Sequence, residues 1–166
     1  MTLGGYDQSR FIPNDVSFQM AEDISRDLVV GLQSITYSDA NHRDAILMAD
    51  GVLAFVDSMV PHLWLPMSAC TAFEKAFGLQ YDSKVERYLV NDTLHENLLR
   101  QNASIAFTLG NGITGGSTVK ISLPYKAFDL ISGPPIITNA SSNYFPLRRA
   151  ANATQYTLGR TLLQEA

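Results

Sequence analysis

The chain has 166 residues, of which 46% are hydrophobic and 17% are charged, and its formal net charge is -4. This length and apolar content suffice for one domain with a sizeable core. The weakly acidic balance and the lack of a Lys/Arg run argue against a nucleic-acid partner. No apolar stretch reaches the length of a transmembrane helix and the first residues lack a signal-peptide pattern, so we expect neither in this segment.

The first half of the sequence predicts antiparallel strands. Residues 16–20 and 28–32 are strand-like runs separated by a polar turn, and residues 37–50 form a polar loop with room for a short strand. Residues 52–56 are β-branched, aromatic and apolar and follow Gly51, which is typical of a core strand.

Two short helices are predicted next. Residues 66–77 place apolar side chains at spacings of three and four, and Gly78 follows as a stop, which indicates an amphipathic helix packed on a sheet. Residues 87–90 predict a strand, after which Asn91 or Asp92 caps a second helix. Its inward-facing residues are expected to be Leu94, Leu98 and Leu99.

The last third again predicts strands. Residues 105–109 and 119–123 alternate across a Gly-rich connection, which indicates a hairpin. Residues 144–149 predict an edge strand, because Pro146 cannot donate to a central ladder. Arg148 and Arg149 offer an anion-binding pair, although adjacent arginines are more often one solvated and one paired.

Asp57 is the candidate functional residue. It is the only carboxylate in residues 51–66 and stands between two apolar runs. A carboxylate at the end of a core strand either faces a cleft or is held by hydrogen bonds, because a buried unpaired carboxylate is too costly.

Residues 55–58, Phe-Val-Asp-Ser, resemble the active-site strand and loop of pepsin-like aspartic peptidases. There, two apolar residues precede Asp-Ser/Thr-Gly, and an apolar segment follows that ends in Pro. Further resemblances follow in the family's order: a Gly pair with Asp at 3–7, a strand at 32–35, a hairpin over 105–124, and a closing Gly and helix over 156–163. The pattern is more similar to the divergent pepsin-like proteins of fungi than to pepsin.

The resemblance implies an all-β fold with short helices, in which antiparallel sheets form a barrel with a ψ-loop. Residues 1–166 would then be a single domain, most of the C-terminal lobe of a pepsin-like fold, truncated at both ends. The implied partners are the N-terminal lobe of the same parent and a protein or peptide substrate, with no cofactor. Because the family draws one carboxylate of its dyad from each lobe, the isolated chain is predicted to be inactive.

The resemblance assigns Asp57 as half of the dyad and Ser58 as the support whose hydroxyl locks the two active-site loops together. Met59 stands in place of the Gly whose N-H approaches the carboxylate, and its side chain is expected to fill space near the reacting water. Val60 replaces a Ser or Thr whose hydroxyl supports the Asp. We therefore expect a degenerate site.

Four Asn-x-Ser/Thr sequons predict glycosylation at Asn91, Asn102, Asn139 and Asn152. With the pepsin-like pattern they predict a protein that is secreted or at the cell surface.

The single cysteine, Cys70, pairs outside this segment or is a small buried hydrophobe on a helix, and we favour the second interpretation. Trp64 is assigned to packing in the core or between lobes. No metal site is expected, because the histidines are far apart in sequence: His42, His62 and His95.

Three functional hypotheses stay open at this point. The first is a secreted aspartic endopeptidase, and the second is a pepsin-like domain that binds a protein or glycan without cleaving it. The third is a homodimer that builds its dyad from two copies of Asp57, which would place Met59 twice at the twofold axis.

Overall fold

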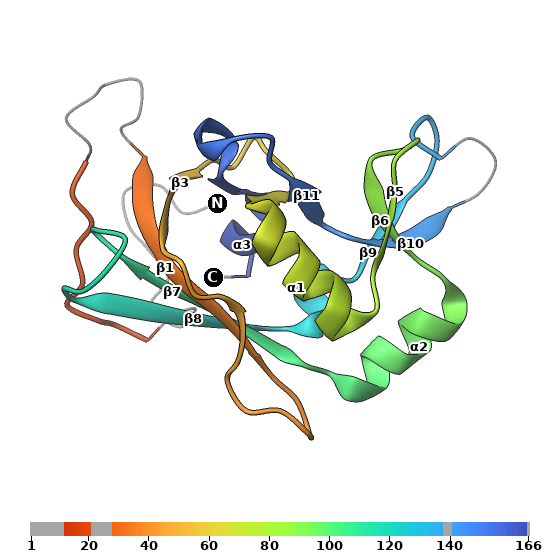
Figure 1. Cartoon of the computed structure of the whole chain (residues 1–166), viewed down its shortest axis with the longest axis horizontal. Coiled ribbons are helices and arrows are strands. Elements are labelled where there is room, and N and C mark those ends of the chain that lie inside the picture. The colour runs from red at the N-terminus through yellow and green to blue at the C-terminus, as the bar shows by residue number, and fades with distance from the viewer. Residues whose placement is uncertain (1–11, 21–27, 138–140, 166) are drawn as a thin grey trace.

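The structure, a computed structural model, describes residues 12–20, 28–137 and 141–165, and its strands form two sheets (Figure 1). The strands are β1 (Val29–Ser38), β2 (Ala45–Met48), β3 (Val52–Val56), β4 (Leu63–Leu65), β5 (Gln80–Asp82), β6 (Arg87–Val90), β7 (Ser104–Gly110), β8 (Thr118–Pro124), β9 (Leu130–Ser132), β10 (Ser142–Phe145), β11 (Leu147–Arg149) and β12 (Thr157–Leu158). The helices are α1 (Met67–Phe77), α2 (Asp92–Gln101) and α3 (Arg160–Leu163), with 3-10 turns η3 (Tyr125–Phe128) and η4 (Ala153–Gln155).

The larger sheet has eight strands in the order β11-β4-β12-β3-β1-β7-β8, with β2 also paired to β1. Strand β12 lies between β3 and β4, parallel to the first and antiparallel to the second. This insertion of a late strand between two earlier ones is a ψ-loop arrangement, so the predicted mostly-β architecture with short helices and a ψ-loop is confirmed.

The smaller sheet has the order β5-β6-β10-β9, and α1 lies between it and the long strands of the larger sheet (Figure 1). Aromatic rings fill the junction. Phe145 of β10 packs on Phe73 and Phe77 of α1 with ring centroids 5.8 and 5.7 Å away, and it stacks on Phe128 of η3 at 5.2 Å. Fully buried aromatic side chains contribute strongly to core stability, so this cluster joins the two sheets through α1.

Both predicted helices form with the expected ends. Helix α1 buries Ala69, Cys70, Phe73 and Phe77, and Gly78 ends it in the left-handed conformation with φ of 66°. Asn91 caps α2 by accepting a hydrogen bond from the Leu94 N-H at 2.9 Å. Leu98 of α2 is buried, but Leu99 is 45% exposed, contrary to the prediction, because adjacent residues on a helix point in different directions.

The strand predicted at residues 16–20 is wrong. This segment has no strand structure, and it is held by hydrogen bonds with Asn111 in the β7–β8 loop. The Asn111 side chain accepts from the Gln19 N-H at 2.8 Å and donates to the Ser17 carbonyl at 2.9 Å. Phe18 is 40% exposed, so the alternation in this segment does not mark a buried face.

The prediction of one edge strand at residues 144–149 is only half right. Pro146 divides this stretch into β10, which pairs with both β6 and β9, and β11, which lies parallel to β4 at the edge of the larger sheet. Because proline cannot donate to a ladder, the chain leaves one sheet and enters the other at this residue.

The strand predicted at 28–32 is longer than expected and continues to Ser38.

Candidate functional site

Asp57 directly follows β3 and is held from behind by β12. Asp57 is a half-buried residue whose backbone N-H donates to the Leu158 carbonyl at 3.2 Å and whose carboxylate accepts the N-H of Met59 at 2.8 Å. A hydrogen bond to a carboxylate is stronger than one between neutral groups. The turn therefore fixes the direction of the Asp57 side chain at the end of a core strand.

The segment after β12 clamps the rest of this loop. Arg160 N-H donates to the Val60 carbonyl at 2.7 Å, and the Thr161 hydroxyl donates to the Pro61 carbonyl at 2.7 Å. Gly159 makes the approach possible, because a Cβ there would lie 2.2 Å from the His62 carbonyl oxygen and 2.4 Å from that of Val60. No side chain fits at those distances, so only glycine is compatible with this crossing.

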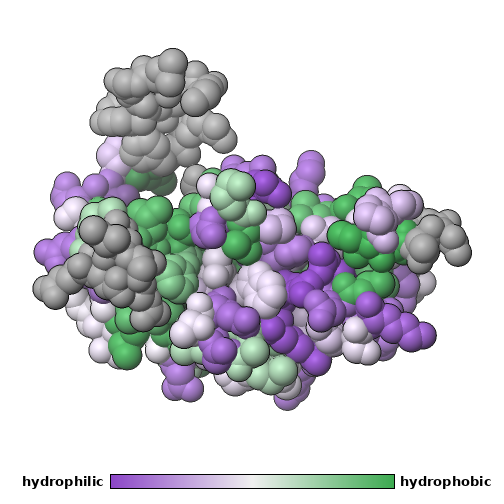
Figure 2. Space-filling view, turned by 90° about the horizontal axis from the view of Figure 1, so that it is seen from above, coloured by the Kyte–Doolittle hydropathy of each residue, from purple (hydrophilic) through white to green (hydrophobic). Residues whose placement is uncertain are grey.

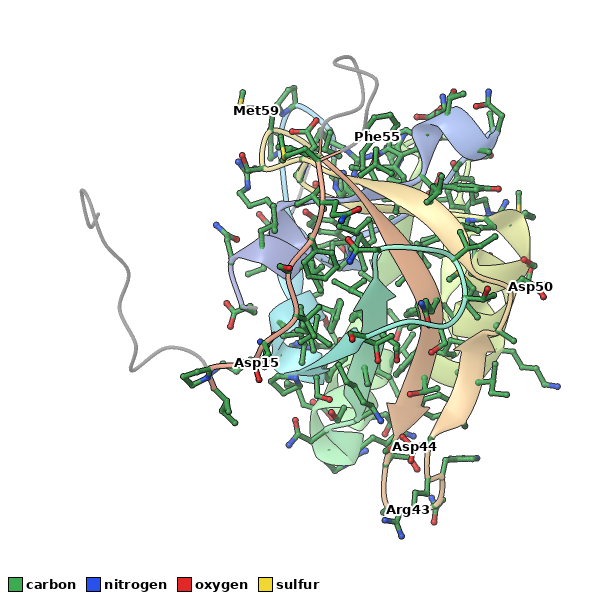
Figure 3. The ribbon with its side chains drawn as sticks, turned by 90° about the vertical axis from the view of Figure 1, so that its left-hand side faces the viewer. Asp15, Arg43, Asp44, Asp50, Phe55 and Met59 are labelled. Atoms are coloured by element: carbon green, nitrogen blue, oxygen red, sulfur yellow. The ribbon has the colours of Figure 1, made fainter. Side chains whose placement is uncertain are left out.

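The structure corrects the expectation for Met59. Its N-H still reaches the Asp57 carboxylate, and its side chain is 84% exposed at one end of the molecule, near Phe55 (Figure 3). The side chain therefore leaves the carboxylate uncovered, because the backbone turn directs it outward. Ser58 is exposed as well.

Val60 has no side-chain hydroxyl that could donate a hydrogen bond to the Asp57 carboxylate. Among the residues that the structure describes, the Met59 N-H is the one protein donor to the Asp57 carboxylate. Asp57 thus has one of the supports that the pepsin-like pattern implies and lacks the hydroxyl of residue 60.

A pocket of about 440 Å³ lies beside the Asp57 loop. It is lined by residues 59–62 of the loop and by Trp64, Arg87, Arg148, Gln155 and Thr157. These residues come from β4, β6, β11, η4 and β12, so segments distant in sequence converge here.

His62 lies against this pocket and is only 6% exposed. Burial, together with the positive charges of Arg148 and Arg160, lowers the pKa of His62 to about 4. The imidazole is therefore neutral at neutral pH. Its ring packs edge-on against Tyr144 with the centroids 5.8 Å apart.

Both adjacent arginines are paired, whereas the sequence favoured one solvated and one paired. Arg148 forms an ion pair with Glu86, and its guanidinium lies 4.9 Å from the ring centroid of the half-buried Trp64. Arg149 pairs with Glu74 at 2.8 Å. Arg148 thus faces the pocket, while Arg149 belongs to a separate network.

The other predicted sites lie away from this loop. Asn91, Asn102 and Asn152 are exposed, and Asn139 and the Gly pair of residues 3–7 lie outside the described residues. Cys70 is fully buried on α1, as we favoured, and burial raises the pKa of its thiol to about 12. The described residues contain no group of three or more His, Cys, Asp or Glu side chains placed to hold a metal ion. None of the described helices is long and apolar enough to cross a membrane.

Sequence reasoning predicted Asp57 at the end of a core strand, where the structure places it, but missed the pocket beside its loop. The adjacent arginines Arg148 and Arg149 were the one feature of the sequence that pointed to an anion-binding site here. Arg87, Arg148 and Trp64 come from three different strands, and only the whole topology brings them together. No local spacing rule connects them.

Comparison with known proteins identifies the fold. No protein-family model matches the chain, and no curated protein matches it. A solved structure with a similar fold is the aspartic proteinase from Irpex lacteus, with a TM-score of 0.63 and 16% sequence identity. The match covers 97% of this chain and 45% of the proteinase, so the chain spans less than half of that protein. The chain therefore has the fold of one lobe of a pepsin-like aspartic protease.

Proposed function

We propose that this chain is one lobe of a secreted, two-lobed pepsin-like aspartic endopeptidase in which Asp57 is one of two catalytic carboxylates. The observation that carries the proposal is the placement of Asp57 at the end of β3, in the ψ-loop, with its carboxylate accepting the Met59 N-H and left uncovered by the Met59 side chain. The similarity to a solved aspartic proteinase supports it, since this chain matches 45% of that protein.

A second lobe would have a suitable surface to contact. Leu53 of β3 is 47% exposed, Leu28 beside Val56 is 58% exposed, and Ile113 beside Gly51 is 46% exposed. Figure 2 shows hydrophobic residues on the half of the molecule that contains β1 and β3, and a second hydrophobic patch at the opposite end. Exposed apolar surface of this kind is typical of a protein interface.

In the proposed reaction the two carboxylates share one proton. One carboxylate takes a proton from the attacking water, and the other donates a proton to the scissile carbonyl oxygen. In this chain the Met59 N-H donates to the Asp57 carboxylate and holds it in position. The substrate is a protein or peptide, and no cofactor takes part.

Substitution of Asp57 tests the proposal. In the full-length two-lobed protein, Asp57→Asn should lower the rate of casein cleavage at about pH 4 at least about a thousand-fold, because an amide can neither take a proton from the water nor share one with the second carboxylate. Asp50→Asn is the matched control, because Asp50 is an exposed carboxylate away from Met59 (Figure 3). Cleavage that persists in the Asp57 variant would remove Asp57 from the mechanism.

We also infer export to the cell exterior or the cell surface, supported by four sequons, of which Asn91, Asn102 and Asn152 are exposed. The secreted protein should lose mass on treatment with an N-glycosidase. Protein recovered from the culture medium with no such loss would show that these sequons are unused.

A second candidate is a pepsin-like domain that binds a protein or glycan without cleaving it. Val60 favours this candidate, because the carboxylate lacks the hydroxyl that the family pattern places at this residue. On this hypothesis the unsubstituted protein does not cleave casein, and Met59→Gly with Val60→Thr restores nothing. Cleavage gained by that double variant would show that the rest of the catalytic apparatus is intact.

A further inference from the structure

The pocket beside the Asp57 loop is positively charged in a chain whose net charge is -4. Two arginines line it, Arg87 and Arg148, and none of its lining residues is an Asp or Glu. Arg160 adds a further positive charge close enough to act on His62. The pocket therefore has the opposite sign to the molecule as a whole.

Arg148 is held rigidly, and its charge is already partly compensated. Its side chain is 13% exposed, stacks over Trp64 and pairs with Glu86, whose own side chain is 61% exposed. An arginine fixed by stacking and by an ion pair is preorganised to receive a further acceptor.

Arg87 supplies the charge that is left over. Its Nη1 donates to the Glu86 carbonyl at 3.0 Å, and no carboxylate of the described residues lies within ion-pair distance of it. Glu86 thus pairs its carboxylate with Arg148 and offers Arg87 only its backbone carbonyl. The pair of arginines keeps about one net positive charge, which a bound carboxylate would neutralise.

Two other polar side chains of the pocket form hydrogen bonds within the protein. The Thr157 hydroxyl donates to the Gln155 carbonyl at 3.0 Å, and the Gln155 side-chain oxygen accepts the Ala151 N-H at 2.7 Å. The imidazole of His62 is neutral at neutral pH because burial and the nearby arginines lower its pKa to about 4. Arg87 is therefore the charged side chain of the pocket wall that has no carboxylate partner among the described residues.

The other walls are apolar. Met59, Val60, Pro61 and the ring of Trp64 line the same pocket of about 440 Å³. This volume lies within the range of small-ligand sites and is large enough for one or two amino-acid side chains. An apolar wall beside a guanidinium fits an apolar side chain next to a carboxylate better than it fits a bare inorganic anion or a polyphosphate.

We propose that this pocket binds an acidic peptide segment, with a Glu or Asp carboxylate paired to Arg87 beside Arg148 and a neighbouring apolar side chain against Trp64 and Pro61. The inference rests on the proposed function in that the ligand is a peptide bound beside the Asp57 loop. It names the class of peptide that this side of the site selects.

Trp64 reports binding directly, because it is the only tryptophan in the chain. The 166-residue chain is titrated with an acetylated and amidated heptapeptide that has a central glutamate between leucines, and with the matching glutamine peptide. At about pH 6 a peptide glutamate is ionised. The glutamate peptide should change the Trp64 fluorescence saturably, with a dissociation constant at least about tenfold lower than that of the glutamine peptide, a modest value for a partly exposed ion pair.

The Arg87→Gln variant should bind the glutamate and glutamine peptides with equal affinity. The Arg87→Lys variant should keep part of the preference for the glutamate peptide, since lysine retains the charge without the planar fork. Arg43→Gln is the matched control and should keep the full preference. Arg43 is exposed at the tip between β1 and β2, at the opposite end of the molecule from Met59 (Figure 3).

Equal affinity for the two peptides, or no saturable change at millimolar peptide, would overturn the proposal. A preference that survives Arg87→Gln would overturn the assignment of Arg87. Because the readout is binding, its outcome is separate from that of the cleavage test: acidic selectivity without cleavage removes the catalytic proposal and keeps this one, while cleavage without selectivity does the reverse.

Discussion

At the scale of single residues, Asp57 shows what the sequence predicts and what it leaves out. Its place at the end of a core strand follows from an apolar run that stops at one carboxylate. The outward direction of Met59 and the burial of His62 do not follow from the apolar run, because the first depends on the turn at Asp57 and the second on the packing of the assembled fold, in which Gly159 crosses behind the loop. The residue types were readable from the sequence, and their exposure was not.

His62 should make the protein less stable in acid. Its ordinary pKa of 6.5 falls to about 4 in the folded state, so between these values the unfolded chain binds a proton that the folded chain does not. Stability is therefore lost as the pH falls from about 6.5 to about 4, by about 3 kcal/mol from this residue. The His62→Phe variant keeps an aromatic ring against Tyr144 and should lose less stability over this window in urea unfolding. Parallel pH profiles for the two proteins would contradict the assignment.

Gly159→Ala should unfold more easily than the parent chain by about 3 kcal/mol, because the new methyl group would meet two backbone carbonyls that cannot move aside. Gly112→Ala is a suitable control, since a Cβ there lies an ordinary 3.6 Å from its nearest neighbour. Urea titration followed by circular dichroism gives both values. A midpoint for Gly159→Ala equal to that of the control would show that the loop moves freely.

At the scale of elements, α1 connects the two sheets through a polar network as well as through its aromatic face. Glu74 of α1 accepts from the Tyr88 hydroxyl of β6 at 2.6 Å and from Arg149 of β11 at 2.8 Å. Arg149 also lies 4.0 Å from the ring centroid of Tyr81 in β5. The helix was predictable from its apolar period, but this network was not, since its members are up to 75 residues apart.

Removing the charge of Glu74 should loosen this junction. Burial alone would raise the pKa of Glu74, but hydrogen bonds from Tyr88 and Arg149 and the charge of Arg149 outweigh it and hold the pKa below its usual value. The contribution of Glu74 to stability is thus present at neutral pH and is lost as the pH falls through this lowered pKa.

We expect Glu74→Gln to reduce the free energy of unfolding by about 2 kcal/mol at neutral pH, with a smaller difference in acid. Guanidinium titrations at both pH values measure the change. Glu96→Gln, at an exposed position of α2, serves as the control and should have no comparable effect. A loss for Glu74→Gln that is independent of pH would point to packing in place of charge.

At the scale of the whole molecule, the Gly-rich β7–β8 connection was predictable as a turn but not as a contact. Its backbone lies directly on β1 and on the residue before β3, where a Cβ at Gly31 or Gly51 would come within 2.0 Å of a carbonyl oxygen of Gly112 or Ile113. The Gln33 side chain of β1 donates to two carbonyls of the same connection, at 3.0 and 2.8 Å. Local sequence rules describe the turn, and only the assembled sheet shows what it covers.

The central claim is that this lobe contributes Asp57 to a working two-carboxylate site. The measurement that tests it most directly is cleavage of unfolded haemoglobin by the full-length protein at about pH 4, with and without a statine-type transition-state inhibitor. The account predicts cleavage that the inhibitor suppresses. No cleavage by a folded two-lobed protein, or cleavage that the inhibitor leaves unchanged, would contradict it.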